Sequence, residues 1–437
     1  MTATGAVWRN WGRTESARPV RVERPATTEA VQRAVAAAAR QGMRIKAVGA
    51  GHSFTGIAVA PGVQLDLADL AGVLEVDAPR GRVRLAAGTR LFDLPRLLRP
   101  HGLALQNMGD IDRQTISGAT STGTHGTGGG FGGLATQIVA VTLVTGAGEL
   151  LRISEEENSE LLPAVRVGLG ALGVLVDLTV QCVPAFLLKA VERPEPLQQT
   201  LESYLERSAA KDHFEFYWFP HTETALTKTN TRLPLGAPRA PLGRVARWRD
   251  DELLANGVYR GVCALGTVAP AIVPPFSRLA QRLTGNRDFT DMSYRVFVTN
   301  RTVRFREMEY ALPRAAVPEA LSEVKSLIER RGWRISFPVE VRSAAADENW
   351  LSTAYGRETG YIAVHRYYRE EPAEYFRAVE EIMTSLGGRP HWGKLHTRDA
   401  AALRESYPRF DDFLAVRERL DPDRRFANAY LERVLGA

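Results

Sequence analysis

The sequence predicts a protein of two domains, in which helices and strands mix without the regular βαβ alternation of a doubly wound sheet. The chain has 437 residues, enough for two domains and a substantial core. Short amphipathic strands and helices follow one another irregularly up to residue 184. The composition then changes to aromatic strands, such as residues 214–219, and to a Pro- and Arg-rich stretch at 233–249 that predicts a loop or lid.

Local patterns place the elements of the first domain. A helix is expected between Thr27, its N-cap, and Gly42, because residues 31–40 are rich in alanine. A shorter helix is expected over residues 92–101, before Gly102. Alternating or apolar runs predict strands at 44–48, 63–67, 82–85 and 175–183, and a hairpin of 138–145 with 150–153.

The second half has fewer clear signals. Helices are expected over 318–331 and 372–386, each followed by glycine. Strands are expected over 335–341 and 361–368. The most apolar stretch, residues 262–275, is too short and too rich in proline to span a bilayer, which favours a buried segment.

Composition and charge argue against several classes of function. Apolar residues make up 44% and charged residues 24% of the chain, as in soluble globular proteins. The net charge is +6, but no basic block alternates with aromatic residues, which disfavours nucleic-acid binding. Cys182 and Cys263 lie far apart and predict buried free thiols of a reducing compartment. The N-terminus lacks the pattern of a secretory signal.

The sequence lacks the motifs of two kinds of catalytic centre. It contains no HExxH and no Cys/His cluster with zinc spacing, so no metal site is predicted. It contains no G-x-S-x-G elbow, which disfavours a serine hydrolase.

The most informative motif is residues 48–53, Val48-Gly49-Ala50-Gly51-His52-Ser53, directly after an expected strand. Glycines let the backbone approach a ligand, and consecutive free N–H groups form a concave site for a pyrophosphate. We therefore predict a dinucleotide redox cofactor, with His52 beside its ring and able to tether it. A Rossmann fingerprint would need a third glycine where Phe54 stands. A structural turn with a core histidine is the other alternative.

Two further clusters of small residues support a large cofactor. Residues 117–130 carry hydroxyls and His125 between expected strands, and residues 168–173 are rich in glycine and precede another strand. A flexible linker has a similar composition to the first cluster, but seldom interleaves a histidine with so many hydroxyls. Small residues permit close contact of the backbone with a flat ring and phosphates.

Charged residues of the second half suggest a polar cleft. Glu340 and Arg342 are two apart on an expected strand, so both side chains lie on one face, while apolar neighbours point to the other. A surface ion pair is the alternative. His365 lies on a comparable strand. Lys394 follows His391 and Trp392 in a turn that could equally be solvated.

Taken together, these motifs resemble the FAD-linked aldonolactone oxidoreductases of the vanillyl-alcohol-oxidase superfamily. The likeness runs from Trp8 to Leu435 and is strongest to bacterial L-gulono-1,4-lactone dehydrogenases and D-arabinono-1,4-lactone oxidases. It rests on Gly49-Ala-Gly-His-Ser-Phe, Gly118-Ala-Thr-Ser-Thr-Gly-Thr-His-Gly-Thr-Gly, Gly170-Ala-Leu-Gly-Val, Glu340-Val-Arg342 and His391-Trp-Gly-Lys394, in that order.

The resemblance implies an α+β fold of two domains. Residues 1–184 would form an FAD-binding domain of the PCMH type. Residues 185–394 would form a substrate-binding cap with a large antiparallel sheet. Residues 395–437 would return to the FAD domain.

The resemblance also implies roles for particular residues. The cofactor contacts would be Val48, Gly49, Ala50, Gly51, His52, Ser53, Ser117, Gly118, Ala119, Ser121, Thr122, Gly123, His125, Gly126, Gly173, Val174 and Lys394. His52 would carry the flavin through its 8α-methyl group. Lys394 would stabilise negative charge at flavin N1. Glu340 and Arg342 would bind substrate hydroxyls or the lactone carbonyl, and His365 would assist deprotonation.

The implied activity is oxidation of an aldono-1,4-lactone of the L-gulono, L-galactono or D-arabinono type, with hydride transfer to flavin N5. Electrons would pass to oxygen or to a cytochrome- or quinone-like carrier. An alditol oxidase that acts on xylitol or sorbitol and produces hydrogen peroxide is the alternative enzyme. A flavin-binding scaffold or sensor is the non-enzymatic alternative. We expect a cytoplasmic protein, and the resemblance leaves peripheral membrane association open.

Overall fold

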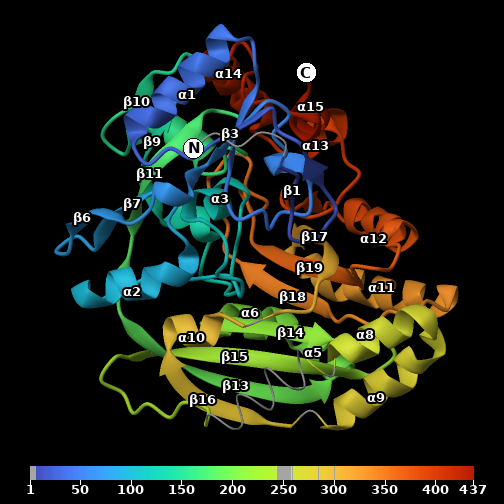
Figure 1. Ribbon diagram of the computed structural model, residues 1–437. Coiled ribbons are helices and arrows are strands. Elements are labelled where there is room, and N and C mark those ends of the chain that lie inside the picture. Colours follow the sequence, from blue (N-terminus) through green and yellow to red (C-terminus); the bar gives the residue numbers. More distant parts are fainter. Residues whose placement is uncertain (1–5, 244–256, 258, 284, 300) are drawn as a thin grey trace.

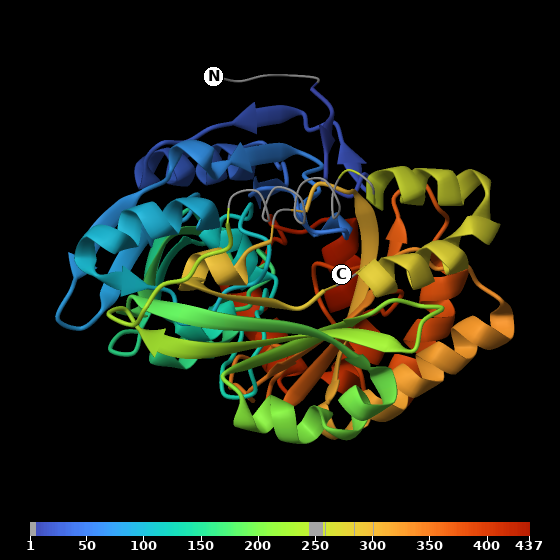
Figure 2. The ribbon, with the colours of Figure 1, turned by 90° about the horizontal axis from the view of Figure 1, so that it is seen from below.

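The computed structural model describes residues 6–243, 257, 259–283, 285–299 and 301–437. Segments from the two ends of the chain pack together in the upper half of Figure 1, where blue and red ribbons lie side by side. The middle of the chain forms a large sheet in the lower half, and its green strands cross the front of the view in Figure 2. The described residues therefore form two layers with separate cores.

The first layer contains two main sheets. A parallel sheet has the order β3 (Arg21–Glu23), β5 (Val63–Asp66), β4 (Ile45–Val48). An antiparallel sheet has the order β10 (Leu150–Ser154), β9 (Ile138–Val144), β11 (Val174–Gln181), β7 (Arg82–Ala86), β6 (Val73–Asp77). Helix α1 (Thr28–Arg40) buries Val31, Val35 and Ala38 against this layer, and Thr27 accepts a hydrogen bond from Ala30 N at its start.

The C-terminal segment belongs to the same core as the N-terminal strands. Helices α13 (Ala400–Ser406), α14 (Phe410–Leu420) and α15 (Ala429–Leu435) bury their apolar residues there. The Asn428 amide donates hydrogen bonds to the carbonyls of Gly56, Ile57 and Val59. Buried Lys46 donates to the carbonyls of residues 169, 170 and 426. Segments about 380 residues apart are thus fastened together.

The second layer is an eight-stranded antiparallel sheet in the described chain. Its order is β16 (Arg287–Met292), β13 (Phe186–Pro196), β15 (Thr224–Pro234), β14 (His213–Trp218), β18 (Val339–Ala344), β19 (Thr359–Tyr367), β17 (Phe305–Pro313), β20 (Arg389–Pro390). Helices α5 (Leu197–Glu202), α6 (Tyr204–Ala210), α11 (Val317–Arg331) and α12 (Ala373–Ser385) cover one face and share its apolar core.

Alternation along the central strands separates two kinds of face. In β18, Val339 and Val341 enter the apolar core, whereas Glu340 and Arg342 point to the opposite face. The same alternation holds in β14, β17 and β19, where Glu215, Glu307, Glu309 and His365 face away from the helices. The charged face lies toward the first layer and builds the polar site between the two.

Most expected elements are present, with informative differences. Strand β18 begins at Val339 rather than at 335, because Pro338 has no N–H for a ladder hydrogen bond and its carbonyl accepts from His365. The expected helix over 92–101 is present as a continuous helical run, in which α2 (Leu94–Leu98) lies between two 3₁₀ turns and Gly102 ends the run with φ = +68°. The start of the cluster at 117–130 belongs to a short helix, α3 (Ile116–Ser121).

Two other expectations concern apolar segments and the possible lid. The stretch 262–275 lies in α8 (Tyr259–Val268) and the turns after it, where Leu265 and Val268 are exposed, so the prediction that it is buried is wrong there.

Cys182 and Cys263 are both buried and free, as predicted. In the expected loop or lid, residues 233–234 end strand β15, and residues 244–249 lie outside the described residues. Within the described residues, no helix is both long and apolar enough to cross a membrane.

Candidate functional site

The three small-residue clusters line one groove in the first layer. Residues 47–53 form the end of strand β4 and the turn after it, residues 114–122 include helix α3, and residues 168–173 precede strand β11. Of the predicted cofactor contacts, eleven line this groove: Val48, Gly49, Ala50, Gly51, His52, Ser53, Ser117, Gly118, Ser121, Thr122 and Gly173.

Two glycines explain why this turn needs its residue types. A Cβ on Gly49 would lie 2.5 Å from Thr115 Oγ1, so no larger residue fits there without movement. Gly51 adopts φ = +67°, a left-handed conformation that favours glycine. The backbone N–H groups of residues 50–53 find no hydrogen-bond acceptor among the described residues. Such consecutive free donors form the concave anion site that the sequence predicts.

The remaining predicted cofactor residues lie elsewhere. The side chains of Ala119 and Val174 are buried in the first core. Gly123 has φ = +77° at the end of α3, and a Cβ on Gly126 would meet the carbonyl of Met108 at 2.3 Å. Their contacts with a cofactor stay predictions. His125 and Lys394 line a second, polar cavity between the layers.

The groove fits FAD by its shape and donors. Its wall consists of small side chains and main chain, which suits a flat ring, and residues 50–53 offer free N–H groups to a pyrophosphate. Lys46 is the charged residue of its lining, and its ammonium group is already bound to three carbonyls. The main chain must therefore supply most of the donors to an anionic cofactor.

His52 stands where this groove, the polar cavity and an outer cleft meet, since it lines all three. Its ring stacks on Trp11 with a centroid distance of 5.7 Å. Burial, together with the positive charges of Lys394, Arg90 and Arg113, lowers the pKa of His52 to about 4. The imidazole is therefore neutral near pH 7, and a ring nitrogen is available to form a bond.

The polar cavity is built around the Arg342 guanidinium. Arg342 pairs with Glu340, with Glu215 at 3.1 Å and with Asp110 at 3.4 Å. Asp110 also pairs with Arg301 at 2.8 Å. Burial opposes ionisation of Asp110, but Arg301 and Arg342 together hold the pKa of its carboxyl well below the usual value. The predicted pair Glu340 and Arg342 is thus a buried network and not a surface ion pair.

Tyr217 joins the same network. Its hydroxyl donates to Glu340 at 3.0 Å and accepts from Arg301 at 3.2 Å. Burial, and then the neighbouring carboxylates Glu215 and Glu340, raises the pKa of this hydroxyl well above its usual value, so it remains a donor. Every charged group around Arg342 is therefore held in place by at least one partner.

Lys394 enters the cavity from a buried turn. Phe54 N donates to the carbonyl of Gly393 at 2.7 Å, and Trp392 is fully buried, so the alternative of a solvated turn is wrong. The ammonium group pairs with Glu307 on β17. Burial alone would lower the pKa of Lys394, but Glu307 and Glu309 raise it above its usual value, so this residue is a cation.

His365 faces the same carboxylate from the neighbouring strand. It is opposite Glu307 in the β17–β19 register, and its Nε2 lies 3.6 Å from that carboxylate. Its Nδ1 donates to the carbonyl of Pro338 at 2.9 Å. In the neutral ring Nε2 is consequently the proton acceptor, and Glu307 stabilises the ring once it is protonated.

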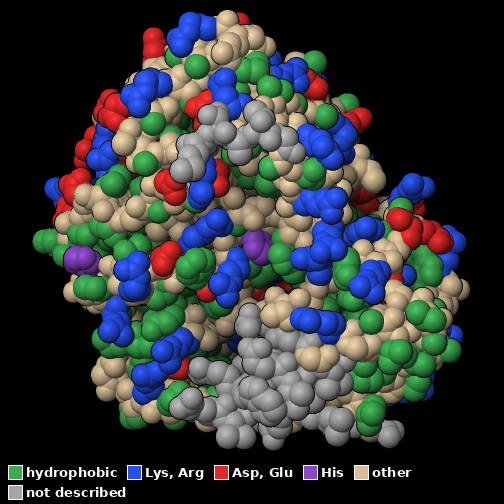
Figure 3. All heavy atoms as spheres, viewed as in Figure 1, with side chains coloured by type: hydrophobic (Ala, Val, Ile, Leu, Met, Phe, Trp, Pro, Cys, Tyr) green, Lys and Arg blue, Asp and Glu red, His purple; other side chains and the backbone are tan. Residues whose placement is uncertain are grey.

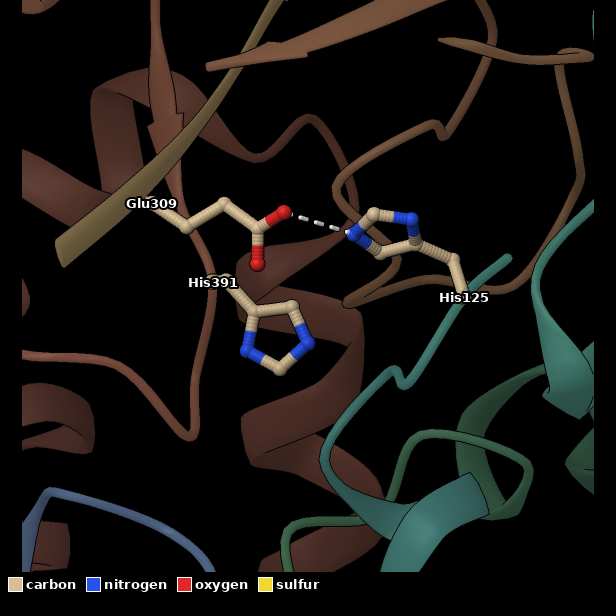
Figure 4. Close-up of side chains that lie close together, drawn as sticks. All are labelled: His125, Glu309 and His391. Carbon is tan, nitrogen blue, oxygen red and sulfur yellow. Dashed lines mark hydrogen bonds and ion pairs between the residues drawn. The ribbon is translucent and has the colours of Figure 1, made fainter. Parts of the chain in front are cut away.

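A third group lies deeper in the cavity. Figure 4 shows His125 and Glu309 pointing toward one another, with His391 beside them; the distance from His125 Nε2 to the carboxylate is 3.1 Å. His125 Nδ1 lies 2.9 Å from the carbonyl of Gly126, so both ring nitrogens face oxygen atoms. The ring stacks on Tyr361 at 3.5 Å. His125, Glu309 and His391 line the same cavity as Lys394.

The sequence analysis missed several residues of the cavity. Glu307 and Glu309 alternate on one strand, a signal that resembles the one used for Glu340 and Arg342. Asp110 and Arg301 lie in irregular segments, and only the folded chain brings them to Arg342. Their sequence neighbours give no comparable signal.

Comparison with solved structures agrees with the fold. Cholesterol oxidase from Brevibacterium sterolicum superimposes with a TM-score of 0.82 at 18% sequence identity, over 100% of this chain and 97% of that chain. Its His121Ala mutant gives a TM-score of 0.83 at 17% identity, with the same coverage. At this identity the likeness shows the fold alone. An FAD-binding-domain profile matches residues 19–154, so the predicted α+β flavoprotein fold is confirmed. Fold and groove together define an FAD-dependent oxidoreductase.

Within that class, the chain belongs to the D-arabinono-1,4-lactone oxidase family, whose profile matches residues 178–434. L-gulono-1,4-lactone dehydrogenase of Mycobacterium tuberculosis is 46% identical over 432 residues, covering 98% of this chain and 99% of that protein. L-gulonolactone oxidase of Bos taurus is 35% identical, and alditol oxidase of Streptomyces is 33% identical, each covering 98% of both chains. The resemblance read from the motifs is confirmed.

Buried histidines predict that the protein is less stable in acid. Burial lowers the pKa of His52, His213 and His391 to about 4 and that of His396 to about 3. Unfolded histidine titrates near pH 6.5, so between about pH 6.5 and 4 the unfolded chain binds more protons than the folded chain through these rings. Their contribution makes the free energy of unfolding fall as the pH falls.

His396→Asn isolates one of these contributions. Asparagine removes the titrating ring, whose Nε2 lies 2.9 Å from the Tyr430 hydroxyl, and is itself uncharged at every pH of the experiment. Urea unfolding between pH 4.5 and 7 should show a slope shallower than in the wild type by up to about 1.4 kcal/mol per pH unit. The exposed His101→Asn should leave the slope unchanged. Equal slopes for wild type and His396→Asn would contradict the prediction.

Proposed function

We propose that this protein oxidises an aldono-1,4-lactone of the L-gulono, L-galactono or D-arabinono type with FAD as its redox cofactor. The observation that carries the proposal is the cavity that joins Lys394, His365, Glu340 and Arg342 beside His52. It presents donors and acceptors to a polyhydroxylated ring, next to the groove that fits the cofactor. The similarity to an L-gulono-1,4-lactone dehydrogenase and an L-gulonolactone oxidase supports this substrate class.

Residues 49–53, 117–122 and 168–173 would hold FAD, which supplies a hydride acceptor when bound. Lys394 would place its positive charge where negative charge develops during hydride transfer. His365 Nε2 would accept the proton of the substrate hydroxyl, because Nδ1 is committed to Pro338. Glu307 would stabilise the resulting cation and orient Lys394.

Glu340 and Arg342 would bind the hydroxyls or the carbonyl of the lactone. Arg342 is fixed by three carboxylates, so its remaining donor capacity is aimed at the cavity with little loss of side-chain freedom. A site organised before substrate arrives orients the reacting carbon without further cost in entropy.

We further propose that FAD is attached covalently through His52. The neutral ring and its position at the junction of groove and cavity support the attachment. Oxygen or a cytochrome- or quinone-like carrier would take up the electrons. The free, buried cysteines fit a cytoplasmic location. Alditols are the second candidate substrate class, because the alditol oxidase of Streptomyces is 33% identical to this chain.

An anaerobic substrate screen tests the proposed function. The purified yellow holoenzyme is mixed without oxygen with gulono-, galactono- and arabinono-1,4-lactones, and separately with xylitol and sorbitol. We expect the lactones to bleach the flavin absorbance and the alditols to act more slowly. Bleaching by alditols alone would favour the alternative substrate class, and bleaching by neither would contradict an oxidase of sugars. Admission of air then reports whether oxygen restores the colour.

Lys394→Met tests the electrostatic role of Lys394. Loss of the buried positive charge should lower kcat on the lactone by about 10²–10³-fold, the range for removal of one preorganised stabilising group. FAD should remain bound, as judged from the absorbance spectrum. Lys189→Met, which changes an exposed lysine on β13, is the matched control. An unchanged kcat in Lys394→Met would remove this residue from the mechanism.

His52→Ala tests the covalent attachment. After acid precipitation, the yellow colour should stay with the wild-type protein pellet and move to the supernatant in the variant. The exposed His101→Ala should behave like the wild type. Release of all flavin from the wild type would show that FAD binds without the bond.

A further inference from the structure

We propose that the outer cleft beside His52 binds a small anionic electron acceptor. The proposal rests on the proposed function, because the acceptor is assigned to a protein that must pass on the electrons of its substrate. The cleft has a volume of about 1180 Å³, and its described lining comes mainly from the segment 91–113 and from residues 294–299 and 301–302. Small-molecule sites have volumes of about 300–1,000 Å³, so this cleft is large enough for such a ligand.

The cleft leads directly to the candidate active site. Trp11, His52, Ile111 and Arg301 line both the outer cleft and the inner polar cavity. His52 also ends the groove that fits FAD. A molecule in the cleft therefore approaches the junction of cofactor and substrate without entering the cavity around Arg342.

The lining of the cleft is strongly basic. Among the described lining residues, five are arginines and one, Asp112, is acidic. The arginines are Arg96, Arg99, Arg113, Arg295 and Arg301. In Figure 3, Lys and Arg side chains lie around a histidine near the middle of the view.

The acidic neighbours neutralise these arginines incompletely. Asp93 lies 3.7 Å from Arg96, and Asp112 lies 3.5 Å from Arg113, and these pairs are exposed to solvent. Loose surface pairs of this kind are worth little. No described acidic side chain lies within ion-pair distance of Arg99. Arg301 is bound to Asp110 at 2.8 Å, and Arg295 lies 3.8 Å from Asp291. Arg96, Arg99 and Arg113 therefore keep the most capacity to attract an anion.

The positive charge of one cleft residue, Arg113, acts on His52. Burial is the largest cause of the lowered pKa of His52, and the charges of Lys394, Arg90 and Arg113 lower it further. A low-dielectric cleft lined by one sign of charge concentrates ligands of the opposite sign and speeds their arrival. The rim also offers Phe92, which is 42% exposed, and Tyr294 as apolar contact for the body of a ligand.

Oxidation of a secondary alcohol to a carbonyl releases two electrons and two protons. Two molecules of a one-electron acceptor, each reduced by one electron, balance each turnover, and the two protons go to solvent. An uncharged lactone gains only hydrogen bonds from these arginines, whereas an acceptor that carries carboxylate, phosphate or a similar charge also gains their electrostatic attraction. We therefore assign the cleft to the second half of the reaction.

Binding can be measured without turnover. Hexacyanocobaltate(III) is a redox-inert trianion, and its binding to the holoenzyme is followed by calorimetry at several salt concentrations. We expect one main site whose affinity falls steeply with salt. The double variant Arg96→Glu/Arg99→Glu should bind hexacyanocobaltate at least about tenfold more weakly than the wild type does. The control Arg330→Glu, an exposed arginine on α11, should bind as the wild type does.

A kinetic arm tests the redox role of the cleft. Reduced holoenzyme is mixed with ferricyanide, an anion, or with hexaammineruthenium(III), a cation. We expect Arg96→Glu/Arg99→Glu to slow reoxidation by ferricyanide about tenfold and to speed reoxidation by the ruthenium complex. Hexacyanocobaltate should compete with ferricyanide in the wild type. Unchanged melting temperature and flavin content verify that the variant folds.

The outcomes separate this inference from the proposed function. If lactones fail to bleach the flavin, reduction by dithionite still allows the reoxidation test, so the acceptor site is judged independently. Absence of hexacyanocobaltate binding, or binding that the charge reversals leave unchanged, would overturn the inference. Equal effects of the reversals on both acceptors would also overturn it, because a general structural defect would then explain them.

Discussion

The structure depends on the desolvation of one face of the large sheet. Charged groups that leave water must be paired, or the cost of their burial is prohibitive. Here Arg342 pairs with three carboxylates, and Lys394 pairs with Glu307. The strands can carry these charges because their alternate residues are anchored in the apolar core under α11 and α12. A two-faced sheet thus supplies both stability and a polar site.

This constraint also explains why the first layer lies over the charged face of the large sheet. The charged face needs a cover that excludes water, and the first layer provides it with its glycine-rich turns. Phe54 and Thr55 hydrogen-bond the turn that carries Lys394, so groove and cavity are joined by main-chain contacts. Charge development during hydride transfer would then occur in a medium where fixed charges act strongly.

The sequence predicts local features well and long-range pairings poorly. Helix α1 was predictable from its Thr27 cap and alanine-rich body, and β18 from the alternation around Glu340, although Pro338 delays its start. The glycine turn at 49–53 was predictable because close backbone approach demands specific residues. Asp110 and Arg301 were not, since their partner Arg342 is far away in the chain and irregular segments have no period.

The buried ammonium group of Lys46 has a consequence for the biogenesis of the protein. Its three carbonyl partners come from residues 169, 170 and 426, and Asn428 supports the turn after His52. The residues that line the cofactor groove all lie between 46 and 175, but the contacts that hold them from behind need residues 426 and 428. A chain that stops before residue 426 lacks one of the three carbonyl partners of Lys46, and with it this link between the two ends of the protein.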